Sequence, residues 1–144
     1  MRSFTYPASL KSERGGEFTV QFPDLPEAIT SGRDREDALI QAADCLEEAI
    51  AGRIADGLEI PEPSAIRKKQ VGISVPATMA AKAALYLAMR SVRVSNVALG
   101  RRLRVNEKEI RRMLDPRHQT KLSTIQEALK VLGKHLVVNM DDAA

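Results

Sequence analysis

The hydrophobic period of this sequence changes once, at Pro76. Before that residue, short runs rich in Phe, Thr, Val and Ile alternate between apolar and polar positions and are separated by glycine and proline, which is typical of strands. After it, apolar residues recur every three or four positions, which is typical of helices. The change predicts two small domains in this chain of 144 residues: an α+β domain over residues 1–76 and an all-α domain over residues 77–144.

The sign of the net charge also changes at Pro76. Residues 1–76 carry 9 Lys or Arg against 13 Asp or Glu, a net charge of −4, whereas residues 77–144 carry 13 against 6, a net charge of +7. A basic half favours a polyanionic partner, and an acidic half favours a basic protein. Aromatic residues make up only 3% of the chain, which lowers the expectation that it stacks on single-stranded RNA.

Other features of the composition limit the class of protein. No run of about 18 apolar residues occurs, and the first ten residues lack an apolar run of signal-peptide length, so a cytoplasmic protein with no membrane partner is predicted. The single cysteine, Cys45, has no Cys or His nearby at metal-ligand spacing. Neither a metal site nor a cofactor is predicted.

The first half is predicted to contain three to four antiparallel strands and one helix. The strands are expected at residues 4–10, 17–22, 28–31 and 71–75. The helix is expected over residues 35–56, where Asp34 can cap its start, Gly57 can end it, and an apolar stripe should cover the sheet: Leu39, Ala42, Ala43, Leu46, Ala49, Ile50 and Ile54. Residues 57–70 have two prolines and no periodicity and are predicted to be a linker.

The second half is predicted to be four helices, at residues 77–90, 96–103, 107–114 and 124–133. The first of them is rich in alanine, a strong helix former, and its expected apolar anchors are Met79, Ala83, Leu87 and Met89. The final segment, HLVVNM, fits either a short strand or a last packed turn.

Residues 95–115, SNVALGRRLRVNEKEIRRMLD, have the parts of a helix-turn-helix at the required spacing. Ser95 can cap the first helix, and Leu99 and Leu103 face the core. Gly100 lies between them and, because it has no side chain, lets the second helix cross closely.

The turn and the second helix follow the same pattern. Val105 is the apolar residue expected to pin the two helices together, and Asn106 with Glu109 three residues on has the spacing of a capping box. One position departs from the pattern, because Arg104 stands where glycine is most common and a left-handed backbone would cost about 1 kcal/mol there. A non-standard turn is therefore expected. The inward face of the second helix consists of Ile110, Met113 and Leu114.

The opposite side of the second helix is chemically able to read bases. Lys and Arg can donate to guanine O6 and N7, and Glu can accept from cytosine N4. Lys108 and Arg112 are predicted to read bases, with Glu107 next and Arg111 reading bases or contacting phosphate. Backbone contacts are expected from Asn96 and from the segment after the helix, where His118 and Thr120 also lie. The candidate DNA-binding residues are Asn96, Asn106, Glu107, Lys108, Arg111, Arg112, Arg117 and Lys121.

Nearly the whole chain resembles one known family. In the first half, YPA, GGEFTVQFPDLPEAITSG and DREDALIQAADCLEEAI resemble the HicB antitoxins. In the second, VPATMAAKAALYLAMR and LRVNEKEIRRMLDPRHQTKLSTIQEALKVLGKHLVV resemble the HicB subgroup that ends in a helix-turn-helix. The resemblance implies a partial RNase H-like fold for the first domain. The chain departs from the family pattern at Glu27, where glycine is usual.

The resemblance also implies a function. HicB antitoxins bind and neutralise HicA, a small mRNA-cleaving toxin, through the N-terminal domain, and repress their own operon by binding operator DNA through the C-terminal one. The acidic first half is in keeping with a basic toxin as partner. Because helix-turn-helix domains usually bind DNA as dimers, a homodimer or higher homo-oligomer is predicted. The candidate toxin contacts lie near the end of the predicted sheet: Tyr6, Phe22, Asp24 and Glu27.

Two other functions compete with this one. An RNase H-like enzyme would need clustered carboxylates to hold two metal ions, but Asp24 and Glu27 lie on a predicted loop and the acidic residues of helix 35–56 occupy its polar positions. No catalytic residue is therefore predicted. A stand-alone transcriptional regulator with an N-terminal ligand-sensing domain would share the DNA-binding half, and a neighbouring toxin gene would distinguish the two.

Overall fold

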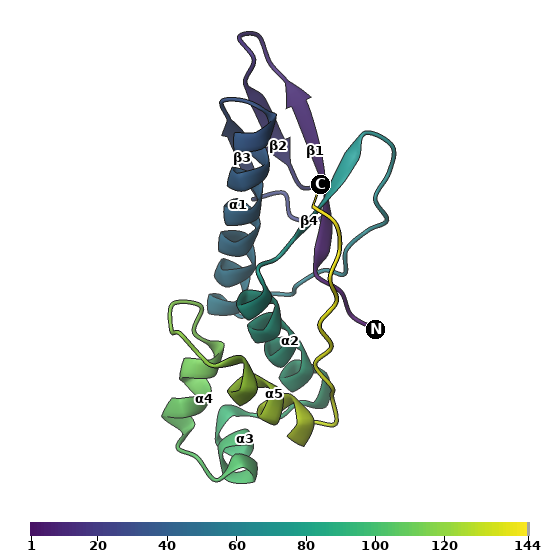
Figure 1. Ribbon diagram of the computed structural model, residues 1–144. Helices are drawn as coiled ribbons and strands as arrows, with labels where there is room; N and C mark the ends of the chain where they lie inside the picture. Colours follow the sequence, from purple (N-terminus) through teal and green to yellow (C-terminus); the bar gives the residue numbers. More distant parts are fainter. Residues whose placement is uncertain (144) are drawn as a thin grey trace. The chain divides into compact units, whose positions relative to one another are not determined.

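The computed structural model describes residues 1–143, in which four strands and one helix are followed by four further helices (Figure 1). The chain divides into two compact units. Met1–Gly52 and Pro61–Pro76 form most of the first unit, and Arg53–Ile60 and Ala77–Asp141 form the second. An α+β region is therefore followed by a helical region, as the change of period predicts.

The first unit is built on a four-stranded antiparallel sheet with the strand order β3-β2-β1-β4. The first three strands form a meander, and β4 adds to the free edge of β1 after the long helix. Ser9 shows the register, since it lies opposite Gln21 of β2 and opposite Gln70 of β4. The strands are β1 Thr5–Ser12, β2 Phe18–Gln21, β3 Ile29–Gly32 and β4 Gln70–Ser74.

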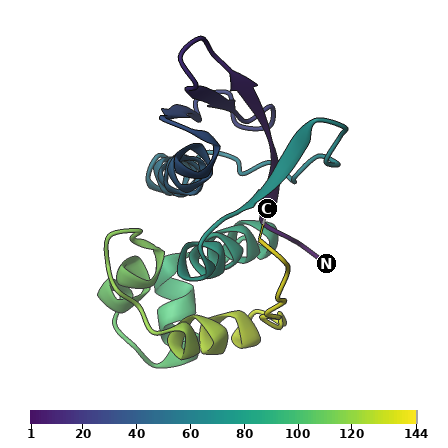
Figure 2. The same ribbon diagram turned by 45° about the horizontal axis from the view of Figure 1, so that its top comes forward.

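One face of this sheet is apolar, as the alternation predicts. Tyr6 of β1, Val20 of β2 and Ile73 of β4 are buried, whereas their neighbours Gln21 and Ser74 are exposed. Helix α1, Arg35–Ala55, lies against the sheet and covers the apolar face (Figures 1 and 2).

The ends of α1 form as its sequence predicts. The carboxylate of Asp34 accepts a hydrogen bond from the Asp37 N–H at 2.8 Å, which satisfies one free donor of the first turn. At the other end Gly57 has a φ of 67°, and the Leu58 N–H returns to the Arg53 carbonyl at 2.8 Å. Glycine adopts this left-handed conformation without a steric cost, so the helix ends there.

The buried residues of α1 are not all those that the sequence predicts. Leu39, Ala43 and Ala49 are only half-buried. The residues that point fully inward follow a spacing of four: Ala38, Ala42, Leu46, Ile50 and Ile54.

The segment after α1, predicted to be a linker, has no helix or strand over residues 58–66 but is held by specific contacts. The Tyr6 hydroxyl donates to the Pro61 carbonyl at 2.7 Å. The backbone N–H and the hydroxyl of Ser64 donate to the Asp24 carboxylate at 2.8 and 2.5 Å. Ile60 is buried. The segment is therefore an ordered part of the fold.

The second unit contains four helices that pack around one core. Two of them have the predicted bounds, α2 extends two residues further, and α5 both begins and ends two residues earlier than predicted. Their bounds are α2 Ala77–Val92, α3 Asn96–Leu103, α4 Glu107–Leu114 and α5 Leu122–Val131.

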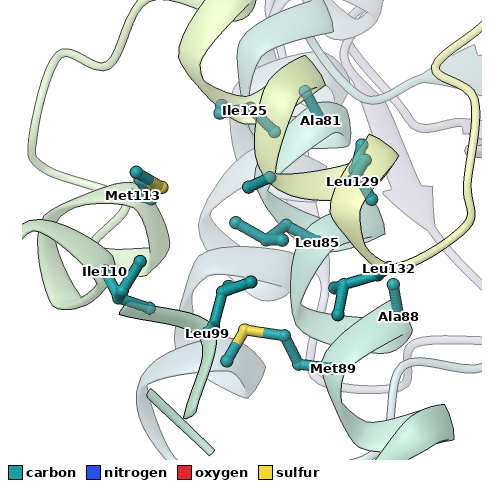
Figure 3. Close-up of a cluster of buried hydrophobic side chains, with 11 residues drawn as sticks. Ala81, Leu85, Ala88, Met89, Leu99, Ile110, Met113, Ile125, Leu129 and Leu132 are labelled. Carbon is teal, nitrogen blue, oxygen red and sulfur yellow. The ribbon is translucent and has the colours of Figure 1, made fainter. Parts of the chain in front are cut away.

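Each helix of the second unit contributes fully buried side chains to this core (Figure 3). Leu85 comes from α2, Leu99 from α3, Ile110 from α4 and Ile125 from α5. The prediction that Leu87 anchors α2 is wrong, because that residue is half-buried and the anchoring leucine is Leu85.

The C-terminal HLVVNM segment forms neither of the two predicted structures. Residues 134–143 have no helix, strand or turn. Leu136 packs against the core of the second unit, whereas Val138 is 74% exposed. Among residues 1–143 no helix is long and apolar enough to cross a membrane.

Candidate nucleic-acid interface

Helices α3 and α4 each begin with a capping side chain. The Ser95 hydroxyl accepts a hydrogen bond from the Ala98 N–H at 3.1 Å, and the Asn106 side-chain oxygen accepts one from the Lys108 N–H at 2.9 Å. Each cap satisfies a backbone donor that the helix cannot pair itself, and a cap of this kind stabilises by about 1 kcal/mol. The sequence therefore fixes the first residue of both helices.

The turn between the two helices is tight and left-handed. Arg104 has φ 57° and ψ 43°, and its N–H donates to the Arg101 carbonyl at 3.2 Å. The next N–H, of Val105, returns to the Gly100 carbonyl at 2.9 Å. The expectation that Arg104 would force a different turn is wrong, because the arginine adopts the left-handed conformation and these two hydrogen bonds offset its cost.

Gly100 is the point of closest approach between α3 and α4. A Cβ atom at this position would lie 2.9 Å from the Val105 carbonyl oxygen and 3.7 Å from a side-chain carbon of Ile110. Leu99 and Ile110 are fully buried beside it, and Met113 completes the inward face of α4 (Figure 3). The predicted role of the glycine and of the inward face is therefore confirmed by the packing.

Two details of the predicted motif are wrong. Val105 does not pin the helices together, since it is 38% exposed and the close contact with Gly100 is made by its backbone oxygen. Glu109 does not close a capping box on Asn106, because its carboxylate accepts from the Arg112 guanidinium instead. Glu109 and Arg112 lie three residues apart on one face of the helix, which brings their side chains within reach of each other.

The outward face of α4 presents three cations and two carboxylates. Arg111 pairs with Glu107 at 3.5 Å, and Arg112 pairs with Glu109, so both arginines have an anionic partner on the same helix. Lys108 is exposed and has no ion-pair partner within residues 1–143. All of these side chains point away from the core that Ile110 and Met113 enter, as the helical period predicts.

The loop after α4 is held by Asp115. Its carboxylate accepts from the Arg117 N–H at 3.0 Å and lies 3.6 Å from the Arg117 guanidinium nitrogen. The backbone hydrogen bond is the main reason that the pKa of Asp115 is lowered from its ordinary value of 3.8, and the charges of Arg117 and Lys82 lower it further against the effect of burial. The Arg117 side chain is otherwise exposed to solvent.

The structure gathers some of the predicted DNA contacts and separates others. A hollow of about 180 Å³ lies between the end of α4 and the start of α5, and Arg112, His118, Thr120 and Lys121 are among its lining residues. Asn96 instead lines a different hollow, of about 360 Å³, at the start of α3.

Lys82 on α2 is a residue of this region that sequence reasoning missed. It is 1% exposed, and its ammonium donates to the Arg112 carbonyl at 3.1 Å, the Asp115 carbonyl at 2.8 Å and the Thr120 hydroxyl at 2.8 Å. Burial lowers the pKa of Lys82, while the charge of Asp115 acts in the opposite direction. A signal was present in the sequence, since Lys82 is the one charged residue between Pro76 and Arg90.

Most of the candidate toxin contacts of the first unit are not at the surface, where a partner could reach them. Tyr6 and Phe22 are buried. Asp24 is half-buried and accepts both hydrogen bonds from Ser64. Glu27 is exposed, so it is the member of this set whose side chain lies most openly at the surface.

The comparisons with known proteins agree on one family. Residues 5–84 match the family model described as the HicB-like antitoxin of bacterial toxin-antitoxin systems. The chain is 42% identical over 135 residues to Antitoxin HicB 2 of Photorhabdus laumondii, and this alignment covers 94% of the chain and 95% of the relative. It is 34% identical to Antitoxin HicB of Escherichia coli K12, over 94% of the chain and 98% of the relative. The chain belongs to the HicB-like antitoxins.

The family model and the individual relatives cover different parts of this HicB-like antitoxin. The family model ends at residue 84, before α3 and α4. The alignments with antitoxins named HicB extend over nearly the whole chain, as does that with Antitoxin HicB 1 of Photorhabdus laumondii, which is 31% identical over 98% of the chain. The helical unit is therefore also shared with these antitoxins.

Carboxylates and the single cysteine do not form a metal centre in the described part of this HicB-like antitoxin. Residues 1–143 contain no group of three His, Cys, Asp or Glu side chains placed to hold a metal ion. Cys45 is half-buried on α1, and burial, with a smaller contribution from the charge of Glu27, raises the pKa of its thiol.

Proposed function

We propose that this protein neutralises a HicA-type mRNA-cleaving toxin through its first unit and represses its own operon by binding operator DNA through its second. Family membership supports the antitoxin role. The observation that carries the DNA-binding part is the outward face of α4, where Lys108, Arg111 and Arg112 project from a helix that Ile110 and Met113 anchor from behind.

The geometry of α3 and α4 supports assigning them as a helix-turn-helix with α4 as the recognition helix. An α-helix with its side chains is about 10 to 12 Å across, so α4 fits a DNA major groove about 12 Å wide. The left-handed turn at Arg104 and the close approach at Gly100 bring the two helices together at a short connection. Arg101 and Arg102 add exposed positive charge to α3 beside it.

The ion pairs on α4 suggest an order among the readers. Lys108 is available without breaking a contact, whereas Arg111 and Arg112 must exchange Glu107 and Glu109 for bases or phosphates. Exposed ion pairs contribute at most about 1 kcal/mol, less than a bidentate contact between arginine and guanine provides. We therefore assign Lys108 and Arg112 as base readers and Glu107 as a further one.

The loop after α4 is assigned to the DNA backbone. Arg112, His118, Thr120 and Lys121 surround the smaller hollow, and Arg117 is exposed next to it. Lys121 also stands at the start of α5 with no side-chain cap, so free backbone N–H groups lie close to its charge. We assign Asn106 and Asn96 to the same class of contact.

The first unit is assigned to the toxin. Its sheet order and single covering helix are in keeping with a partial RNase H-like fold. Glu27 and Asp24 provide acidic groups near one end of the sheet for a basic toxin, and we propose that Tyr6 and Phe22 support that surface from the core. Covering the toxin's active surface needs no chemistry from the antitoxin, and we expect it to take place in the cytoplasm.

The DNA-binding proposal is tested by titrating a duplex from upstream of the protein's own operon, and a scrambled duplex of equal length, while fluorescence anisotropy is recorded. We expect Arg112→Ala or Lys108→Ala to cost about 1 to 3 kcal/mol on the operator and to change binding to the scrambled duplex much less. Lys121→Ala should weaken both duplexes and reduce the salt slope by about 0.9. Lys130→Ala, at the other end of α5, is the matched control and should change neither.

Two outcomes of this titration decide between the assignments. If Arg112→Ala and Lys121→Ala lower affinity equally on both duplexes, α4 does not read bases. If the unaltered protein does not distinguish its operator from the scrambled duplex, the repressor assignment is wrong. Light scattering of the complex tests the expected homodimer, which should bind an inverted repeat with half-sites about one helical turn apart.

The toxin proposal is tested by co-expressing the antitoxin with the small basic protein encoded beside it. We expect a stable complex and recovery from the growth arrest that the toxin alone produces. Glu27→Lys reverses one exposed charge of the first unit and should weaken the complex, whereas Lys130→Ala should leave it intact. A folded antitoxin that binds its operator but retains no such partner would instead be a stand-alone regulator.

A further inference from the structure

The ammonium of Lys82 is the one charged group in the interior of the second unit. Lysines are almost never fully buried unless their charge is compensated. Here the side chain is 1% exposed, and the three N–H donors of the ammonium have three acceptors within hydrogen-bonding distance. These acceptors are the carbonyls of Arg112 and Asp115 and the hydroxyl of Thr120. All of its hydrogen-bonding capacity is directed at the end of α4 and the loop that follows.

Stability alone does not account for a lysine at this position. A buried charge loses its hydration, and an apolar side chain of similar volume often stabilises a core equally well or better. A fully paired polar network instead favours one arrangement of its members, because displacing any acceptor leaves a buried charge short of a partner. The positive charge also lies at the C-terminus of α4, where it complements the helix dipole.

The three acceptors belong to the parts of the unit that would contact DNA. Arg112 offers its carbonyl to Lys82 on the inside and its guanidinium on the outside. Thr120 immediately precedes Lys121, and its hydroxyl also lies 3.3 Å from the Arg112 carbonyl and 3.1 Å from the His118 ring. The ammonium nitrogen of Lys82 thus bonds both to Arg112, a predicted base reader, and to Thr120 in the loop predicted to bind phosphate.

We infer that Lys82 is a positioning residue that holds the end of α4 and the Asp115–Lys121 loop in the arrangement that binds operator DNA. This inference rests on the proposed DNA binding. Lys82 itself is too deeply buried to touch a duplex, so it acts through Arg112 on base reading and through Thr120 on the backbone contacts.

The test compares two substitutions on α2. Lys82→Met keeps a flexible side chain of similar length and removes the charge and all three hydrogen bonds. Leu85→Ala removes a fully buried side chain of the same helix, from a hydrophobic cluster to which none of residues 115–121 belongs, so it serves as a destabilised control. Both variants are assayed at a temperature at which circular dichroism shows them folded.

We expect folded Lys82→Met to bind the operator at least tenfold more weakly than the unaltered protein. Its slope of log affinity against log salt should be smaller by about one to two, since each lost phosphate contact lowers it by about 0.9. Folded Leu85→Ala should keep the affinity and the slope. Thr120→Val, which removes one acceptor and leaves the lysine in place, should give an intermediate loss and keeps the test valid if Lys82→Met does not fold.

Hydrogen exchange separates this inference from the DNA-binding proposal because it needs no DNA. Amides of residues 112–121 should exchange faster in Lys82→Met and Thr120→Val, while those of α3 stay as in the unaltered protein. If exchange over this stretch is unchanged, or if the folded variants bind the operator with unchanged affinity and salt slope, Lys82 is not a positioning residue. If exchange changes but the unaltered protein binds no operator, Lys82 still positions the loop and the proposed DNA function is wrong.

Discussion

The candidate contact residues of the two units differ in how deeply they are buried. In the first unit, Tyr6 and Phe22 are part of the core, Asp24 is held by Ser64, and of the four candidates only Glu27 is exposed. In the second unit none of the eight DNA candidates is buried. The helical period of α4 gives the direction of each side chain as well as its position. Asp24 and Glu27 instead lie between β2 and β3, where no such period gives the direction of a side chain.

The largest effect that this comparison predicts belongs to Phe22. Removing a fully buried aromatic side chain leaves a cavity, so Phe22→Ala should lower the free energy of unfolding by about 3 to 5 kcal/mol, measured by urea denaturation. If Phe22 is a core residue, any loss of toxin binding in this variant follows from the loss of stability.

Glu27→Ala and Lys108→Ala are the matched surface controls for this change, one in each unit. Both side chains are exposed, and surface substitutions usually change stability by no more than about 0.5 kcal/mol. A Phe22→Ala variant that is nearly as stable as the unaltered protein but has lost its partner would show that the aromatic ring contacts the toxin directly.

Two glycines should respond in opposite ways to the same substitution. In the second unit, Gly100→Ala forces a Cβ to within 2.9 Å of the Val105 oxygen and should cost about 1 to 3 kcal/mol. In the first unit, Gly52 lies in α1 with no atom within 4 Å of the same position, and Gly52→Ala should stabilise by about 0.5 to 1 kcal/mol. Thermal unfolding of both variants measures the pair, and shifts of equal sign would contradict the packing described for α3 and α4.

Replacing the left-handed Arg104 by glycine should change the stability by a smaller amount. Arg104→Gly removes the Cβ that is unfavourable at φ 57°, so a stabilisation of about 1 kcal/mol is expected, reduced by the greater flexibility of the unfolded chain. Arg101→Gly, within α3, is the control and should destabilise by a similar amount. If Arg104→Gly is also destabilising, the arginine side chain makes a contribution to the turn that exceeds its backbone cost.

Much of the fold was predictable because local rules and tertiary packing agree. Asp34 and Gly57 bound α1, and Ser95 and Asn106 fix the starts of α3 and α4, since capping depends on residues close in sequence. The inward face of α4 followed from periodicity in the same way.

What could not be predicted depends on contacts between residues far apart in the chain. The hydrogen bonds of Asp24 with Ser64 and of Tyr6 with Pro61 join segments about forty residues or more apart, and they turn an apparent linker into ordered structure. Lys82 is understood only when the end of α4, thirty residues away, is placed beside it. Helical spacing around Lys82 gives its direction but not the acceptors that make its burial possible.

The smallest predicted effect concerns one aspartate in each unit, Asp37 in the first turn of α1 and Asp115 after the end of α4. Backbone N–H groups of Arg33 and Arg117 donate to Asp37 and Asp115, and for each carboxylate this hydrogen bond is the main reason that the pKa lies below 3.8. A lowered pKa in the folded state means that the unfolded chain takes up the proton first as the pH falls. The stabilisation is therefore complete at neutral pH and is lost as the pH drops below 3.8 toward the folded-state pKa.

Asn substitutions test this dependence because Asn cannot titrate. The difference in unfolding free energy between pH 7 and pH 3 should be smaller in Asp37→Asn and in Asp115→Asn than in the unaltered protein, and smaller still in the double variant, since the two carboxylates accept hydrogen bonds from different residues. Asp115→Asn also removes the negative charge that acts on the buried ammonium of Lys82. If only Asp37→Asn flattens the acid dependence, the charge of Asp115 does not stabilise its turn in solution.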